Sequence, residues 1–136
     1  MGVTLNPYLS FKENAREAME FYKSVFGGEL TSSTFADLGG DVKPDEQNLI
    51  MHSHLQGDNG IVLMGADTPS HMEFKEGSNG QISLSGDDDG TLRGYWDKLS
   101  GDGTVTVPLE TATWGDAFGM CTDRFGIGWM VNIAGS

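Results

Sequence analysis

Two seven-residue stretches, FYKSVFG at residues 21–27 and YWDKLSG at residues 95–101, decide the prediction of the fold. Each has an aromatic pair, an apolar residue three positions further on, and a glycine at its end. Apolar residues at this spacing are typical of the buried face of a helix, and glycine is typical of a helix C-terminus. The sequence therefore predicts one such helix in each half of the chain.

The segments around the first helix predict four strands. Alternating apolar and polar residues, or runs rich in β-branched and aromatic residues, indicate strands at 5–11, 29–37, 48–56 and 61–66. Asn14 is predicted to open the helix, and its spacing from Glu17 matches a capping box with Asn in place of Ser or Thr. The first half thus has the order βαβββ.

The second half repeats this order, with strands predicted at 81–86, 104–109, 118–122 and 129–134. Asp87, Asp88 and Asp89 precede a helix at 91–99 and are expected to cap its free N–H groups. The repeated order favours an internal duplication. We expect an α+β chain, a single domain over residues 1–136, with modules at about 5–66 and 81–134. A linker at 67–80 joins them and carries His71 as a solvated residue.

Composition restricts the class of partner. Eight Lys and Arg against 20 Asp and Glu give the 136-residue chain a net charge of −12. Such a surface repels nucleic-acid phosphates and anionic membranes, so we expect neither as a partner. The single cysteine, Cys121, rules out an internal disulfide and a Cys-rich zinc site. With no signal-like segment at residues 1–11, the expected location is cytoplasmic.

Short motifs are spread over nearly the whole chain, from about residue 5 to 133: NPYLSF at 6–11, NAREA at 14–18, FYKSVFG at 21–27, IMHS at 50–53, LM at 63–64, PLE at 108–110, WG at 114–115, FGM at 118–120, DRFG at 123–126 and WMVN at 129–132. Together they resemble the motifs of PhnB-like proteins of the vicinal oxygen chelate superfamily, which includes glyoxalase I, extradiol dioxygenases and bleomycin resistance proteins.

The resemblance implies a fold and the location of a site. In this superfamily each βαβββ module forms half of an open barrel-like cavity that holds a ligand, and many members are homodimers. PhnB-like proteins often carry a 3-demethylubiquinone methyltransferase label. The sequence disfavours that activity here, because it has no Gly-rich strand-to-helix turn of the dinucleotide type. Family membership alone does not fix the chemistry.

The metal ligands of the superfamily are missing from their usual strands. Metalloenzymes of this type place His, Glu or Tyr on the first and last strands of each module, where a divalent ion acts as a Lewis acid. Here the strand at 5–11 offers only Tyr8, and the strand at 129–134 has Asn132 where Glu would be expected. The strands at 61–66 and 81–86 offer none of the usual ligands. The standard metal centre is therefore predicted to be absent.

A relocated metal site is an alternative. His52 and His54 are two residues apart on a strand, so their side chains point to one face. With Glu110 as a third ligand they would suit Zn, Fe, Mn or Ni in a lyase, isomerase or dioxygenase. The other interpretation is that one histidine lines the cavity or is hydrogen-bonded in the core, while the other lies near the strand end.

The resemblance, together with polar residues set among aromatic ones, implies that six residues line the ligand cavity: Tyr8, His52, Glu110, Trp114, Phe118 and Asn132. Glu110 or His52 would be the general base of an enzyme. Alternatively, Glu110 caps the loop to Trp114, and Asn132 ties down the loop at Asp123 and Arg124. In a binding protein without chemistry, the aromatic residues would stack on a small organic ligand. Cys121 is expected to be a buried, inert thiol.

Overall fold

The computed structural model describes residues 3, 5–39, 42–70 and 80–135. The chain divides into two compact units, Met1–Lys75 and Glu76–Ser136, each built from four strands and a long helix. His71 and most of the predicted linker lie outside the described residues. None of the described helices has the length and apolar character needed to cross a membrane.

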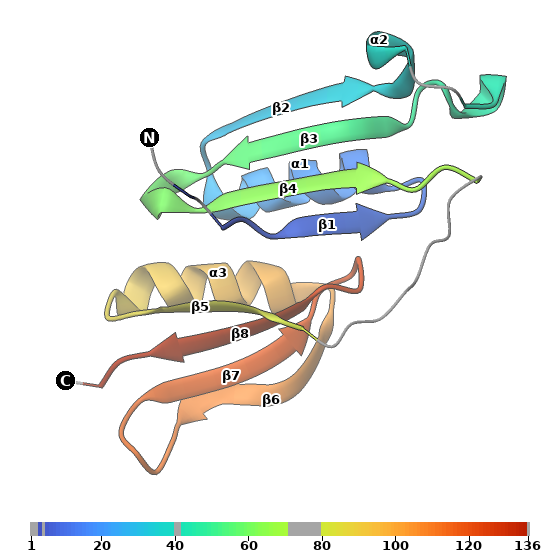
Figure 1. Ribbon diagram of the computed structural model, residues 1–136. Coiled ribbons are helices and arrows are strands. Elements are labelled where there is room, and N and C mark those ends of the chain that lie inside the picture. The colour runs from blue at the N-terminus through green and yellow to red at the C-terminus, as the bar shows by residue number, and fades with distance from the viewer. Residues whose placement is uncertain (1–2, 4, 40–41, 71–79, 136) are drawn as a thin grey trace. The chain divides into compact units, whose positions relative to one another are not determined.

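The first unit is a four-stranded sheet with a helix across one face (Figure 1). Its long elements are β1 (Tyr8–Phe11), α1 (Ala15–Phe26), β2 (Glu29–Thr34), β3 (Ile50–Gln56) and β4 (Val62–Asp67). The strand order is β1-β4-β3-β2, with β1 parallel to β4 and the other pairs antiparallel. The predicted βαβββ order is confirmed for this half.

The second unit repeats this plan with β5 (Ile82–Gly86), α3 (Asp89–Gly101), β6 (Thr104–Thr111), β7 (Ala117–Thr122) and β8 (Gly128–Ile133). The strand order is β5-β8-β7-β6, and the outer strand β5 is again the one that runs parallel to its neighbour. Each sheet is open, with two edge strands, and does not close into a barrel. The α+β class and the repeated module are therefore confirmed.

Glycines let each helix approach its sheet. A Cβ added at Gly65 of β4 would lie 3.1 Å from the Met19 sulfur of α1, and one added at Gly119 of β7 would lie 2.9 Å from Trp96 of α3. The odd-numbered residues of these two strands therefore face the helices. The apolar residues among them belong to the core. This core also contains Leu9, Phe11, Tyr22, Phe26, Leu55, Leu63, Leu99, Trp129, Val131 and Ile133, all buried.

The N-terminus of α1 differs from the prediction. Asn14 is the N-cap, but its side chain makes no capping hydrogen bond. The Asp67 carboxylate takes this role: it accepts from the Ala15 N–H at 2.9 Å and from the Ile50 N–H at 2.9 Å. Asp67 is buried and is the last residue of β4, one residue beyond the strand end predicted at 66. One carboxylate thus joins β4 to α1 and β3.

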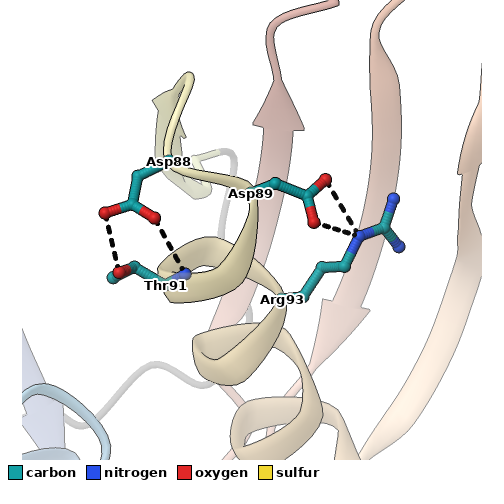
Figure 2. Close-up of polar contacts among 4 residues, drawn as sticks. All are labelled: Asp88, Asp89, Thr91 and Arg93. Carbon is teal, nitrogen blue, oxygen red and sulfur yellow. Dashed lines mark hydrogen bonds and ion pairs between the residues drawn. The ribbon is translucent and has the colours of Figure 1, made fainter.

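The N-terminus of α3 agrees with the prediction. Figure 2 shows the Asp88 carboxylate accepting from the Thr91 N–H at 3.2 Å and from the Thr91 hydroxyl at 2.8 Å. Asp89 lies in the first turn and pairs with Arg93 one turn later, at 3.0 Å. An anion here complements the helix dipole as well as the free N–H groups.

Short helical segments between β2 and β3 were not predicted. The strand expected at 29–37 ends at Thr34, because Thr34 and Asp37 form a capping box that starts α2 (Phe35–Leu38). The 3₁₀ turn η1 (Pro44–Glu46) follows, and η2 (Asp58–Gly60) connects β3 to β4. Glu46 is buried, and hydrogen bonds from Ser70, above all from its backbone N–H, hold the pKa of this carboxyl below its usual value.

Candidate functional site

The predicted site residues gather on the sheet face opposite the helix, which we call the helix-free face of each unit. Because Gly65 and Gly119 face the helices, their strand neighbours Met64 and Phe118 face the other way. The strand register then assigns the residues of the neighbouring strands to one face or the other.

In the first unit, one row of paired residues crosses the helix-free face. Tyr8 pairs with Met64, Met64 with His54, and His54 with Thr31. His52 lies two residues from His54 on β3, and its ring centroid is 6.3 Å from that of Tyr8. The prediction that both histidines share a face is therefore confirmed. Both are half-buried, whereas Tyr8 is exposed.

In the second unit, an equivalent row contains three of the predicted residues. Ser85 pairs with Asn132, Asn132 with Phe118, and Phe118 with Glu110. The polar side chains of Asn132 and Glu110 thus flank the Phe118 ring on the helix-free face. A second row of Ser83, Met130, Met120 and Val107 lies beside it. Polar groups around an apolar centre are what an amphipathic organic ligand requires.

Trp114 extends this face from the hairpin between β6 and β7. Its ring centroid lies 6.2 Å from that of Phe118, with the planes tilted by 56°. The side chain is 64% exposed, the most exposed aromatic ring of the second unit. An exposed Trp next to a half-buried Phe offers an aromatic surface on which a planar molecule can stack.

Glu110 is within a strand rather than in a loop. β6 continues to Thr111, two residues beyond its predicted end at 109, and Glu110 is exposed on it. The register is irregular between Val107 and Glu110, where three steps on β6 match two on β7. This irregularity places Glu110 on the helix-free face beside Phe118, although simple alternation from Val107 would place it on the other face.

Asp116 is a residue of this site that sequence reasoning missed. Its carboxylate accepts from the Asn132 side-chain amide at 3.0 Å and from the Gly135 N–H at 2.8 Å. These two bonds, the Asn132 bond first, hold the pKa of Asp116 below its usual value, and Trp114 makes a smaller contribution in the same direction. The Asn132 amide nitrogen is therefore bound to Asp116 rather than to the loop at 123–124, which was the alternative to a ligand contact.

Asp123 belongs to the core rather than to the helix-free face. It is buried, and its carboxylate accepts from Trp129 Nε1 at 2.8 Å and from the Phe125 and Ile127 N–H groups at 2.8 and 3.1 Å. The Arg124 guanidinium lies over the Phe125 ring, 4.7 Å from its centroid. Cys121 is buried as predicted, and burial, reinforced by the charge of Asp123, raises the pKa of its thiol to about 11.

The comparisons with known proteins agree with this architecture. The model of the Glyoxalase/Bleomycin resistance protein/Dioxygenase superfamily matches residues 4–131. The chain belongs to this superfamily. A crystal structure of protein PA1353 from Pseudomonas aeruginosa is 32% identical and covers 99% of this chain and all of that one, with a TM-score of 0.82.

Two further proteins are similar along nearly their whole length. Protein YjdN of Escherichia coli is 24% identical over 140 residues, which cover 95% of this chain and 94% of that protein. The structure of a PhnB protein from Bacillus cereus is also 24% identical, covers 97% of this chain and all of that one, and has a TM-score of 0.76. At this identity the PhnB structure supports the fold alone, and its methyltransferase label does not carry over.

A metal centre would require several His, Cys, Asp or Glu side chains that lie close together. Within the described parts of the chain, no three His, Cys, Asp or Glu side chains are grouped so that they could hold a metal ion. His52 and His54 are two imidazole donors on one strand face, whereas Glu110 belongs to the other unit. The relocated site would need ligands from both units, and it stays a prediction.

Proposed function

We propose that this protein binds a small organic molecule with a planar apolar part, held by the helix-free face of the second sheet. The observation that carries the proposal is the register of β5, β8, β7 and β6, which sets Asn132 and Glu110 on either side of Phe118. The Trp114 ring, close to Phe118, supplies a second aromatic surface. Membership in a superfamily that includes bleomycin resistance proteins supports binding as the activity.

The first unit contributes polar and aromatic groups of a similar kind. Tyr8, with its phenolic hydroxyl, lies beside the His52 imidazole on the helix-free face of its own sheet. Both groups can donate or accept a hydrogen bond. We therefore propose that Tyr8 and His52 also contact a ligand, on the helix-free face of the first sheet. The catalytic roles predicted for His52 and Glu110 remain hypotheses until a substrate is known.

Replacing Trp114 with alanine is expected to weaken ligand binding about three- to tenfold, the range that a lost aromatic contact gives. Because the ring is 64% exposed, we expect little change in the melting temperature of the unliganded protein. A thermal-shift screen of planar compounds would provide ligands, and titration calorimetry would give the dissociation constants of wild type and variant.

Val105→Ala is the matched control, because Val105 is an exposed apolar residue of β6 that pairs with Cys121 and so belongs to the opposite face. We expect this variant to bind with wild-type affinity. Ligands that bind Trp114→Ala and Val105→Ala equally well would place the binding site elsewhere and refute the proposal.

A metal-dependent lyase, isomerase or dioxygenase is the second candidate. It is favoured by one observation: His52 and His54 lie on the same strand face and are both half-buried. Elemental analysis of untagged protein tests it directly. Near-stoichiometric Zn, Fe, Mn or Ni that disappears in His52→Ala would establish this candidate, whereas metal at background in both proteins would remove it.

A further inference from the structure

The orientation of the Asn132 amide is set by a carboxylate that no motif identified. An amide has a donor end and an acceptor end, and which end faces the ligand decides what the ligand must offer. An ionised carboxylate can only accept hydrogen bonds. Asn132 must therefore direct its nitrogen toward Asp116, as it does at 3.0 Å.

Asp116 itself is held firmly. The Gly135 N–H donates to its other carboxylate oxygen at 2.8 Å, and its own carbonyl oxygen accepts from the Ala112 N–H at 2.7 Å. It thus links the β6–β7 hairpin to the end of β8. This anchoring leaves the Asn132 amide with its carbonyl oxygen directed away from Asp116, on the strand face that Asn132 shares with Phe118.

We infer that Asp116 is a positioning residue that presents the Asn132 carbonyl oxygen to the ligand, so that this face takes a planar organic molecule carrying a hydrogen-bond donor. The inference rests on the proposed function and specifies its ligand class. The Glu110 carboxylate on the far side of Phe118 is a second acceptor. The two acceptors favour a hydroxyl, amide or ammonium donor over a carboxylate or ether.

Naphthol and its methyl ether provide a direct test, since the two share a planar ring and only naphthol has a donor. Both are neutral, so the loss of a negative charge in a variant does not by itself change their relative affinity. We expect calorimetry to show that wild type binds naphthol roughly tenfold more tightly than the ether, as expected for one hydrogen bond to the site.

Asp116→Asn is expected to lower this ratio several-fold, while the second acceptor, Glu110, is unchanged. An amide at position 116 can donate as well as accept, so the Asn132 amide is free to reverse. Asp88→Asn is the matched control, because it makes the same change in a carboxylate that caps α3 in the same unit. It should keep the wild-type ratio. An equal ratio in wild type and Asp116→Asn, or a ratio near one in wild type, would overturn the inference.

A second test uses the wild-type protein alone, so its result does not depend on whether the Asp116→Asn variant folds. The Asn132 amide and the Gly135 N–H donate to the two oxygens of one carboxylate, so nuclear Overhauser effects should connect their protons. Their absence would contradict the orientation. If both naphthalenes bind equally and Trp114→Ala weakens both, the inference fails and the proposed function stands. If wild type binds neither and no planar compound from the screen binds in a Trp114-dependent way, both fail.

Discussion

Asp123→Ala is expected to lower the free energy of unfolding by about 2–4 kcal/mol, measured by urea denaturation followed by Trp fluorescence. The reason is the loss of an acceptor for three donors at once. Trp129 is fully buried, and Asp123→Ala removes the carboxylate oxygen to which its indole N–H donates at 2.8 Å. The Phe125 and Ile127 N–H groups lose their shared acceptor as well.

A double-mutant cycle with Trp129→Phe separates these contributions. Phenylalanine has no N–H group, so the Asp123→Ala change should cost less in the Trp129→Phe background than in wild type. Equal costs in both backgrounds would show that the indole bond contributes nothing. An Asp123→Ala protein within about 0.5 kcal/mol of wild type would contradict the structural role of this carboxylate.

Asp67→Ala is expected to be similarly costly, at about 2–4 kcal/mol, because it leaves two buried backbone donors without their acceptor. One is the Ala15 N–H at the start of α1, and the other is the Ile50 N–H at the start of β3. The loss also removes a negative charge from the N-terminus of α1, where it complements the helix dipole. Hydrogen exchange at Ala15 and Ile50 should accelerate more than at other core amides.

Two variants control this experiment. Asp67→Asn keeps one side-chain oxygen and nearly the same volume, so we expect a loss of stability between those of wild type and Asp67→Ala. Asp97→Ala removes an exposed carboxylate from the middle of α3 and should change stability by less than about 0.5 kcal/mol. If Asp67→Ala behaves like Asp97→Ala, the carboxylate does not hold α1 to the sheet.

The fold could be predicted from the sequence because its signals are local and occur twice. The helical stripe before Gly27 and its counterpart before Gly101 lie in the same order of strands, and the structure has a helix at both positions. The exception is the strand expected at 29–37. Thr34 and Asp37 there form a capping box, a signal that was available but was outweighed by the β-branched residues before it.

The carboxylates that organise each unit could not be predicted in the same way. Asp67 was placed in the linker because the apolar run ends at Ala66, and its partners are 52 and 17 residues away in sequence. Asp116 and Asn132 are 16 residues apart and come together only because β7 and β8 pair in register. Contacts of this kind depend on tertiary structure, which local patterns do not encode.

The candidate site was predicted in part. Alternation correctly placed His52 with His54 on a shared face. Glu110 lies on the helix-free face because of a register irregularity in β6, and no sequence pattern predicted this irregularity. The list of ligand-binding residues came from the resemblance and from polar residues set among aromatic ones, and their ligand-binding role stays a proposal.

Chemical-shift mapping tests the central claim most directly. A planar ligand from the screen would be titrated into ¹⁵N-labelled protein while the backbone amides and the Trp114 indole N–H are followed. The account predicts that the largest shifts fall on Trp114, Phe118 and Asn132, and that Trp114→Ala reduces the affinity measured in the same titration. Shifts concentrated on α3, or an affinity unchanged in Trp114→Ala, would contradict it.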